Sequence, residues 1–290
     1  MRKKVCIITG SNSGIGKAAA IQIAQAGYHV IMACRDAARG EAALQEVRQQ
    51  AGNGSAELML VDMSLQSSIQ TFAQAVQAKY ETVDVLIHNA AAFDTTQKKA
   101  RLTAEGIEHI WATNHIGPVL LTKLLLDAIK RSNQGRIITI SSKGLLVFPF
   151  LKVNLADPEF RKRRFSVTKA YYQSKLAQVM YTYWLADKLR ETAVTFNAIR
   201  VTNVKIDIET RYPNASKLMK FMYAQKSRSS ISPEEMAKTY LYLAVSDEVA
   251  GVTGTYFDDP THIVSSSKYS YDKENIAQVM ALTMGYLQDN

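Results

Sequence analysis

Tyr171 and Lys175 are the residues of this chain whose types and spacing most directly suggest chemistry. They lie four positions apart, so on a helix a phenol and an ammonium share one face. A free phenol has a pKa of about 10, which is too high for efficient proton exchange near neutral pH. A nearby positive charge favours the phenolate and lowers that pKa. We therefore expect Tyr171, but not the adjacent Tyr172, which has no lysine at this spacing, to exchange a proton with a substrate oxygen.

A glycine-rich turn lies near the front of the chain, between an expected strand and an expected helix. Gly10 permits a tight turn, while Gly14 and Gly16 let the backbone approach a phosphate at the start of the helix. The alternative is a helix N-terminus whose glycines are merely flexible. We expect the turn to bind the pyrophosphate of a dinucleotide through Gly10, Ser11, Asn12, Ser13, Gly14, Ile15 and Gly16.

The end of the second expected strand favours NADP(H) over NAD. Arg35 offers a planar, permanently charged group to a 2′-phosphate, whereas an acidic residue there would bind a ribose hydroxyl. The adjacent Asp36 is expected to cap the next helix. Further cofactor contacts are expected from Asp62 and Met63 after the third strand, and from Asn89, Ala90 and Ala91 after the fourth.

Alternating strands and helices must position these residues. Short apolar runs predict strands at residues 5–9, 29–33, 56–61, 83–88, 135–141, 193–199 and near 254–257. Helical patterns cover residues 14–26, 37–50, 65–80, 103–131, 167–190, 233–246 and 271–287. This order predicts one α/β domain, residues 1–290, with a doubly wound parallel sheet of about seven strands and helices on both faces. Insertions at about 143–166 and 207–231 are expected to form substrate loops, although the second could be a helix packed on the core.

The composition excludes several classes of protein. With 47% hydrophobic and 21% charged residues, the 290-residue chain can bury a large core. No run of about 18 apolar residues appears and no signal peptide is recognised, so we expect a cytoplasmic protein without integral membrane association. The net charge of +9 gathers mildly at residues 98–101, 152–169 and 211–228 without forming one tract or a basic stripe, so nucleic-acid binding is not predicted. Cys6 and Cys34 are expected to be buried, and the five histidines lack the spacing of metal ligands, so no metal site is expected.

Taken together, these motifs resemble the short-chain dehydrogenases/reductases over essentially the whole chain. The resemblance is strongest to the branch of retinol dehydrogenases, WW-domain oxidoreductases and protochlorophyllide reductases, through residues 33–36, 102–117 and 249–257. It implies a Rossmann-type fold and a catalytic group made of Asn114, Ser142, Tyr171 and Lys175.

The resemblance also implies roles for the two new members of this group. Ser142 would donate a hydrogen bond to the substrate oxygen, and Asn114 would position a water that passes protons on from Lys175. Ser141 is the alternative to Ser142, since only one of two neighbours on a strand can face the cofactor. His115 is expected to pack beside Asn114 and not to take part in catalysis.

One stretch departs from the pattern of the family. Where relatives carry Pro-Gly and then a threonine that contacts the carboxamide end of the cofactor, this chain has Val201, Thr202 and, at the threonine position, Ile206. The grip on the nicotinamide end is therefore expected to be weaker or built differently, from Thr202 or Asn203.

The predicted function is an NADP(H)-dependent oxidoreductase that transfers hydride between nicotinamide and a carbonyl or secondary alcohol of a mainly apolar substrate. The alternatives are a non-catalytic NADPH-binding regulatory protein, motivated by residues 201–206, and a sugar epimerase or dehydratase. Those enzymes usually carry Gly-x-x-Gly-x-x-Gly and a larger C-terminal domain, which this chain does not show. The absence of an apolar N-terminal anchor is expected to disfavour a retinoid. A homodimer or homotetramer would pair through residues 103–131 and 167–190.

Overall fold

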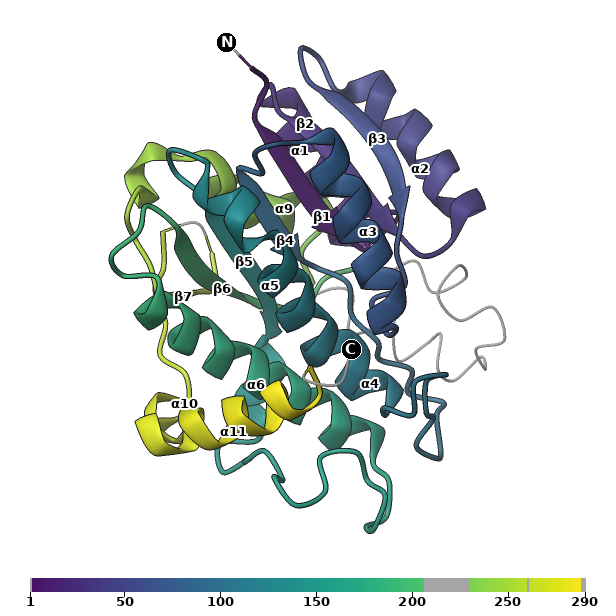
Figure 1. The fold of residues 1–290 in the computed structure, drawn as a ribbon, viewed down its shortest axis with the longest axis vertical. Helices are drawn as coiled ribbons and strands as arrows, with labels where there is room; N and C mark the ends of the chain where they lie inside the picture. Colours follow the sequence, from purple (N-terminus) through teal and green to yellow (C-terminus); the bar gives the residue numbers. More distant parts are fainter. Residues whose placement is uncertain (1, 206–229, 260, 288–290) are drawn as a thin grey trace.

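Seven strands form one parallel sheet in the computed structural model, which describes residues 2–205, 230–259 and 261–287. The strand order is β3-β2-β1-β4-β5-β6-β7, so the direction of winding reverses between β1 and β4, and the predicted doubly wound architecture is confirmed (Figure 1). The strands are β1 Val5–Thr9, β2 His29–Cys34, β3 Ser55–Leu60, β4 Val85–His88, β5 Arg136–Ser142, β6 Thr195–Val201 and β7 Tyr256–Phe257.

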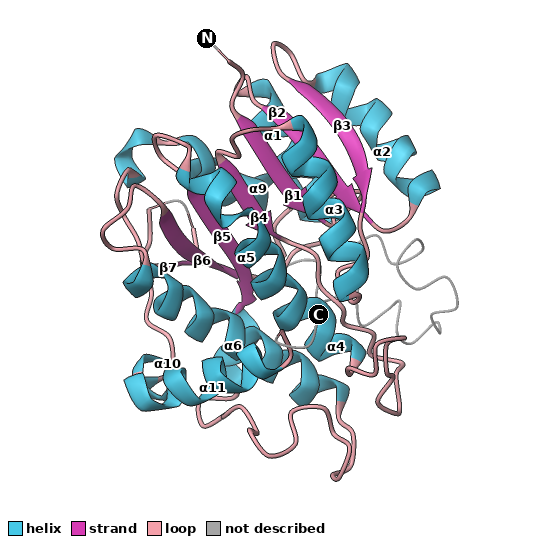
Figure 2. Cartoon of the chain, viewed as in Figure 1, coloured by secondary structure: helices cyan, strands magenta, loops and turns pink. Residues whose placement is uncertain are grey.

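Helices cover both faces of the sheet because its strands are apolar on both sides. Helices α3, α5 and α6 lie on one face and α1, α2 and α9 on the other (Figure 2). Val5 and Ile7 of β1 belong to the same core cluster as residues of the first three helices, whereas Cys6 and Ile8 belong to the cluster on the other face. The bounds of these helices are α1 Gly14–Gln25, α2 Ala37–Gln50, α3 Gln66–Lys79, α5 Gly117–Lys130, α6 Val167–Lys188 and α9 Pro233–Val245. Both cysteines are buried and free, as predicted.

The predicted continuous helix over residues 103–131 is wrong. Its first part is a turn closed by a bridge between Leu102 and Glu108, with Gly106 at a φ of +79° that favours glycine. The Glu108 carboxylate then accepts a hydrogen bond from the Trp111 N–H (2.8 Å) and caps α4, His109–Trp111. A π-helical turn, Ala112–Ile116, joins α4 to α5.

The predicted C-terminal helix over residues 271–287 is present, but it begins two residues later and follows a separate short helix. α10, Lys268–Tyr271, ends before Asp272, whose side chain accepts a hydrogen bond from the Asn275 N–H (2.8 Å) and caps α11, Lys273–Gly285. The buried side chains of α11 join the same core as those of α6 (Figure 1). The surface of α6 that we expected to pair with a second copy is therefore covered in part by the chain's own C-terminal helix, and the oligomeric state stays a prediction.

Most of the second expected insertion, residues 206–229, lies outside the described residues. The first insertion opens with a short 3₁₀ helix, Lys143–Val147, and continues as an irregular segment to the start of α6. Among the described residues, no helix combines the length and the hydropathy needed to cross a bilayer.

Candidate active site

A cleft of about 1150 Å³ opens at the carboxyl ends of the strands. Its position matches the rule that ligands of open parallel sheets bind where the strand order reverses. Most of the predicted site residues line it, namely Gly10, Asn12, Ser13, Gly14, Ile15, Gly16, Arg35, Asp62, Met63, Asn89, Ala90, Ala91, Ser142, Tyr171, Lys175, Thr202 and Asn203. Two predicted residues, Ser11 and Asn114, are fully buried beneath the cleft and do not line it.

The glycine-rich turn is shaped for close approach. Gly10 has a φ of +66°, and a Cβ there would lie 2.8 Å from Ala90 Cα. A Cβ on Gly16 would lie 2.4 Å from the Asn89 amide nitrogen, whereas a Cβ on Gly14 would meet nothing within 4 Å. The turn is thus tightly packed below and open above Gly14, at the start of α1. This arrangement fits a dinucleotide pyrophosphate.

Side chains under the turn hold its carbonyl groups. The Asn89 amide donates hydrogen bonds to the carbonyl oxygens of Thr9 (2.9 Å) and Gly10 (3.0 Å). The fully buried Tyr240 of α9 donates to the Asn89 side-chain oxygen (3.1 Å). Ser11 Oγ donates to the Ile8 carbonyl (3.0 Å), so its side chain faces the core. Sequence reasoning missed Tyr240, because only the packing of α9 on the sheet brings it to Asn89.

Three cationic or polar side chains line the cleft in addition to Arg35 and were not predicted. They are Arg39, Lys17 and His109. The Asp36 carboxylate accepts a hydrogen bond from the Arg39 N–H (2.9 Å), as the predicted cap requires. This cap places Arg39 in the first turn of α2, so its position could have been predicted from the sequence. Arg35 lies 3.8 Å from an Asp62 carboxylate oxygen. The cleft therefore presents two guanidinium groups to an anion, one just after β2 and one in the first turn of α2.

Lys175 is fully buried on the inner face of α6. Its Nζ donates hydrogen bonds to the Ile140 carbonyl (2.7 Å) and to the Gln178 side-chain oxygen (2.9 Å), and lies 5.8 Å from the centre of the Tyr171 ring. Burial lowers the pKa of Lys175 to about 7. Gln178 was not predicted, although its position one helical turn after Lys175 is a signal that sequence spacing could have provided.

Asn114, in the π-helical turn, joins the Ala92 backbone to Ser174 of α6 through its side chain, and we call this set of hydrogen bonds the clamp. Its side-chain oxygen accepts a hydrogen bond from the Ala92 N–H (2.7 Å), and its amide nitrogen donates to the Ala92 carbonyl (3.1 Å) and to Ser174 Oγ (3.0 Å). Both donors of the side chain are therefore used within the protein. His115 is buried and hydrogen-bonded to Thr283 of α11 (2.7 Å), in agreement with the packing role that we expected.

The structure separates the two candidate serines at the end of β5. Ser141 is almost fully buried, and its hydroxyl donates weakly to the Lys175 carbonyl (3.4 Å). Ser142 is half-buried at the cleft, where its Oγ accepts a hydrogen bond from the Gly144 N–H (3.2 Å). Both serines line the cleft, and Ser142 is the more exposed of the two.

Aromatic rings surround Tyr171. The ring of Phe93 lies 4.3 Å from that of Tyr171, Tyr172 packs edge-on at 5.1 Å, and Phe148 lies 4.9 Å from Tyr172, all between ring centres. Phe93 was not predicted as a site residue, although it follows the predicted Asn89, Ala90 and Ala91 closely. These rings give this end of the cleft an apolar wall.

The unusual stretch after β6 follows a defined path up to Lys205. Val204 pairs with Ile231, the Lys205 N–H donates to the Ile231 carbonyl (2.9 Å), and the Ile231 N–H donates to the Asn203 carbonyl (3.1 Å). Thr202 and Asn203 line the cleft. Ile206, which stands at the threonine position of the expected pattern, lies outside the described residues.

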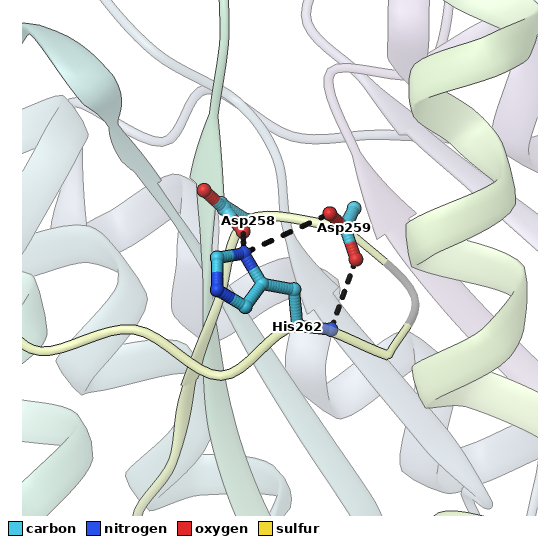
Figure 3. A group of neighbouring side chains, drawn as sticks. All are labelled: Asp258, Asp259 and His262. Atoms are coloured by element: carbon cyan, nitrogen blue, oxygen red, sulfur yellow. Dashed lines mark hydrogen bonds and ion pairs between the residues drawn. The ribbon is translucent and has the colours of Figure 1, made fainter.

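A separate group near β7 brings three potential metal ligands together. Single ligand atoms of Asp258, Asp259 and His262 all lie within 4.8 Å of one another (Figure 3). The Asp258 carboxylate, however, already accepts from the Arg200 guanidinium (2.5 Å) and contacts His262 Nδ1 (2.8 Å). Its charge is thus compensated by the chain itself, and we interpret the group as an ion-pair network.

Comparison with known proteins links this geometry to characterised families. The family described as short chain dehydrogenase matches residues 4–150, and the family described as enoyl-(acyl carrier protein) reductase matches residues 160–258. Retinol dehydrogenase 13 of Homo sapiens is 34% identical over 263 residues, which cover 88% of this chain and 76% of the relative. Retinol dehydrogenase 14 of Homo sapiens is 36% identical over 273 residues, which cover 89% and 79%.

Solved structures share the fold. A putative uncharacterized protein from Mycobacterium paratuberculosis superposes with a TM-score of 0.73 at 28% identity, covering 97% of this chain and 92% of its own. A putative NAD(P) dependent gluconate 5-dehydrogenase from Beutenbergia cavernae, solved with bound NADP, has a TM-score of 0.65 at 25% identity, covering 89% and 94%. The two family matches include both the glycine-rich turn and the helix that carries Tyr171 and Lys175.

Proposed function

This chain belongs to the short-chain dehydrogenase family, and on that premise we propose that it is an NADP(H)-dependent oxidoreductase acting on a carbonyl/alcohol pair of a mainly apolar molecule. The observation that carries the proposal is that Tyr171, Ser142 and Lys175 line the same cleft as the glycine-rich turn. A protein that only sensed the cofactor would need the glycine-rich turn to bind it, but it would not need these three side chains for proton transfer.

The residues of the cleft suit NADP(H). The open surface above Gly14 would receive the pyrophosphate, and Arg35 and Arg39 would contact a 2′-phosphate through charge-assisted hydrogen bonds. When bound, the cofactor supplies or accepts the hydride. The preference for NADP(H) rests on these two arginines, since NAD has no phosphate for them to contact.

The proton chemistry would belong to the side chains of the chain. In the direction of reduction, the Tyr171 hydroxyl gives its proton to the carbonyl oxygen, and in oxidation the phenolate takes the proton back. The Ser142 hydroxyl donates a hydrogen bond to the same oxygen while negative charge develops there. Lys175, held by Ile140 and Gln178, favours the phenolate of Tyr171 when its own ammonium is charged.

The rings of Phe93, Tyr172 and Phe148 support an apolar substrate. They lie beside Tyr171, and Phe93 and Tyr172 line the cleft directly. A flat or conjugated molecule would bury its faces against them, with its carbonyl directed at Tyr171 and Ser142.

NADPH oxidation measured over a panel of aldehydes and ketones tests the proposal. We expect turnover with apolar carbonyls, and Tyr171→Phe should lower kcat by about 10²–10⁴-fold because general acid catalysis is lost. Tyr183→Phe is the matched control, since it removes a hydroxyl on the same helix that is bonded to Ser266 outside the cleft, and it should change kcat by less than about tenfold. NADPH binding, followed by fluorescence titration, should persist in both variants. If NADPH binds but no carbonyl is reduced, and Tyr171→Phe changes nothing measurable, the protein is a regulatory cofactor binder and the proposal is refuted.

A further inference from the structure

Three large apolar side chains are exposed together in the segment that follows Ser142. The exposed fractions are 55% for Leu146, 74% for Val147 and 92% for Phe150, all within five residues. The other large exposed apolar residues of the described chain, such as Leu60 at 53%, are scattered over distant elements. Single exposed apolar residues are ordinary, but a contiguous group marks an interaction surface.

This apolar group lies next to the mouth of the cleft. Lys143 and Gly144, which begin the same segment, line the cleft, and Phe148 packs on Tyr172 between the exposed residues and the site. The 3₁₀ helix of this segment has no fully buried residue; Leu145 packs partly against the core, and Leu146 and Val147 face outward. Whatever binds the apolar group is therefore held close to the entrance used by a ligand.

The segment that carries the apolar group is strongly positive. Residues 143–169 contain seven basic and two acidic side chains, a net charge of +5 out of +9 for the whole chain. The two acidic residues are already engaged, since Asp157 pairs with Arg163 and Glu159 pairs with Arg161. The five other cations form no ion pair with any described residue, namely Lys143, Lys152, Lys162, Arg164 and Lys169, although Lys152 lies over the Tyr269 ring.

We propose that residues 143–169 dock on an anionic lipid bilayer, with Leu146, Val147 and Phe150 entering the interface and the basic side chains contacting headgroups. Exposed apolar side chains flanked by cations are the combination that such surfaces select. A second copy of this chain fits less well, because a symmetric contact would place one +5 segment against another. If the segment docks on a membrane, an apolar substrate would enter the cleft from the bilayer, and this consequence rests on the proposed function. The binding of the segment to the bilayer does not depend on the proposed function.

Vesicle co-sedimentation of the full chain tests the proposal. We expect binding to phosphatidylcholine vesicles containing about 30% phosphatidylserine, with little binding to pure phosphatidylcholine and weakening as salt is raised. The double variant Val147→Ser/Phe150→Ser should lower the affinity at least about tenfold. Lys162→Glu/Arg164→Glu should lower it by a larger factor, since each cation near an anionic surface contributes roughly fivefold. Leu60→Ser is the matched control, because it removes an exposed apolar side chain outside the segment and should leave vesicle affinity unchanged.

Several outcomes would overturn the proposal. These are failure of the wild-type protein to bind the anionic vesicles, equal affinity of the apolar double variant, or equal loss in Leu60→Ser. Loss of self-association in the double variant without any vesicle binding would identify a second copy as the occupant. Circular dichroism and NADPH titration show whether each variant is folded. Because sedimentation needs no turnover, a protein that binds vesicles but reduces no carbonyl would refute the proposed function alone.

Discussion

Glu108 provides a test of the electrostatics that support the site. Its carboxylate is buried, with one oxygen capping α4 through the Trp111 N–H (2.8 Å) and the other oxygen without a hydrogen-bond partner among the described residues. Burial, assisted by the nearby charge of Glu159, raises the pKa of Glu108 to about 7 from an ordinary value of 4.5. The cap begins the helical segment that carries Asn114, so the protonation of Glu108 acts on the stability of the site's own support.

The sign and size of the effect follow from linkage. Between pH 4.5 and 7 the folded state binds more protons at Glu108 than the unfolded state, so stability from this group is present at low pH and lost as the pH rises. The difference between the two pKa values corresponds to about 3 kcal/mol when the group is fully ionised. Glu108→Gln imitates the protonated form and keeps the acceptor for Trp111. Relative to wild type, the variant should therefore gain about 2 kcal/mol of unfolding free energy between pH 5 and pH 8.

Urea unfolding of both proteins at pH 5, 6, 7 and 8 measures this gain. The unfolding free energy of Glu108→Gln must be compared with that of wild type at each pH. Burial lowers the pKa values of His88 and His115 to about 3, so these two residues make both proteins more stable as the pH rises. Glu105→Gln is the control without a pH trend in this range. Burial raises the pKa of Glu105, but hydrogen bonds from Ser67 and Gln66 outweigh it and lower that pKa from its ordinary value of 4.5, so the stabilisation by its carboxylate is lost only in more acidic solution and the cost of the substitution should be nearly constant from pH 5 to pH 8. A difference between Glu108→Gln and wild type that is constant with pH would refute the reasoning.

Two further predictions concern the cofactor. Arg35→Ala should weaken NADPH binding roughly tenfold, at the low end of a charged hydrogen bond because Arg35 is exposed, and leave NADH unchanged; titration with both nucleotides measures this, and equal losses would show that Arg35 does not contact the 2′-phosphate. Tyr240→Phe removes the hydrogen bond to Asn89 and should raise the Kd for NADPH about fivefold. An unchanged Kd in that variant would mean that Asn89 holds the glycine-rich turn without help.

The fold and the centre of the site were predictable because they depend on local patterns. Apolar runs marked the buried strands, and the spacing of Tyr171 and Lys175 placed both on one helix, where the structure has them. The glycines at positions 10, 14 and 16 fell in a strand-turn-helix context that single residues could not have indicated.

The missed features depend on contacts between distant segments. Tyr240 meets Asn89 across 151 positions of the chain, and Phe93 meets Tyr171 only after two elements pack together. The error over residues 103–131 has a different cause. Its apolar spacing suits a helix throughout, but Gly106 and the capping of α4 by Glu108 begin the helix later, and apolar periodicity does not record a cap.

Because of the π-helical turn at residues 112–116, the geometry of the site depends on how many residues the chain has there as well as on which residues they are. Such a turn holds one residue more than an α-helical turn, so the faces of α4 and α5 are rotated relative to one another by about 100°. Deleting Thr113 would merge the two helices into one continuous repeat. Asn114 would then turn away from Ala92, unless α5 moved instead. Gly117 of α5 already packs so closely on Met63 that a Cβ on it would lie 2.2 Å from the Met63 carbonyl oxygen, which leaves little room for α5 to move in that direction. A chain shorter by this one residue would keep its composition and its sheet, yet lose the clamp beneath the cleft.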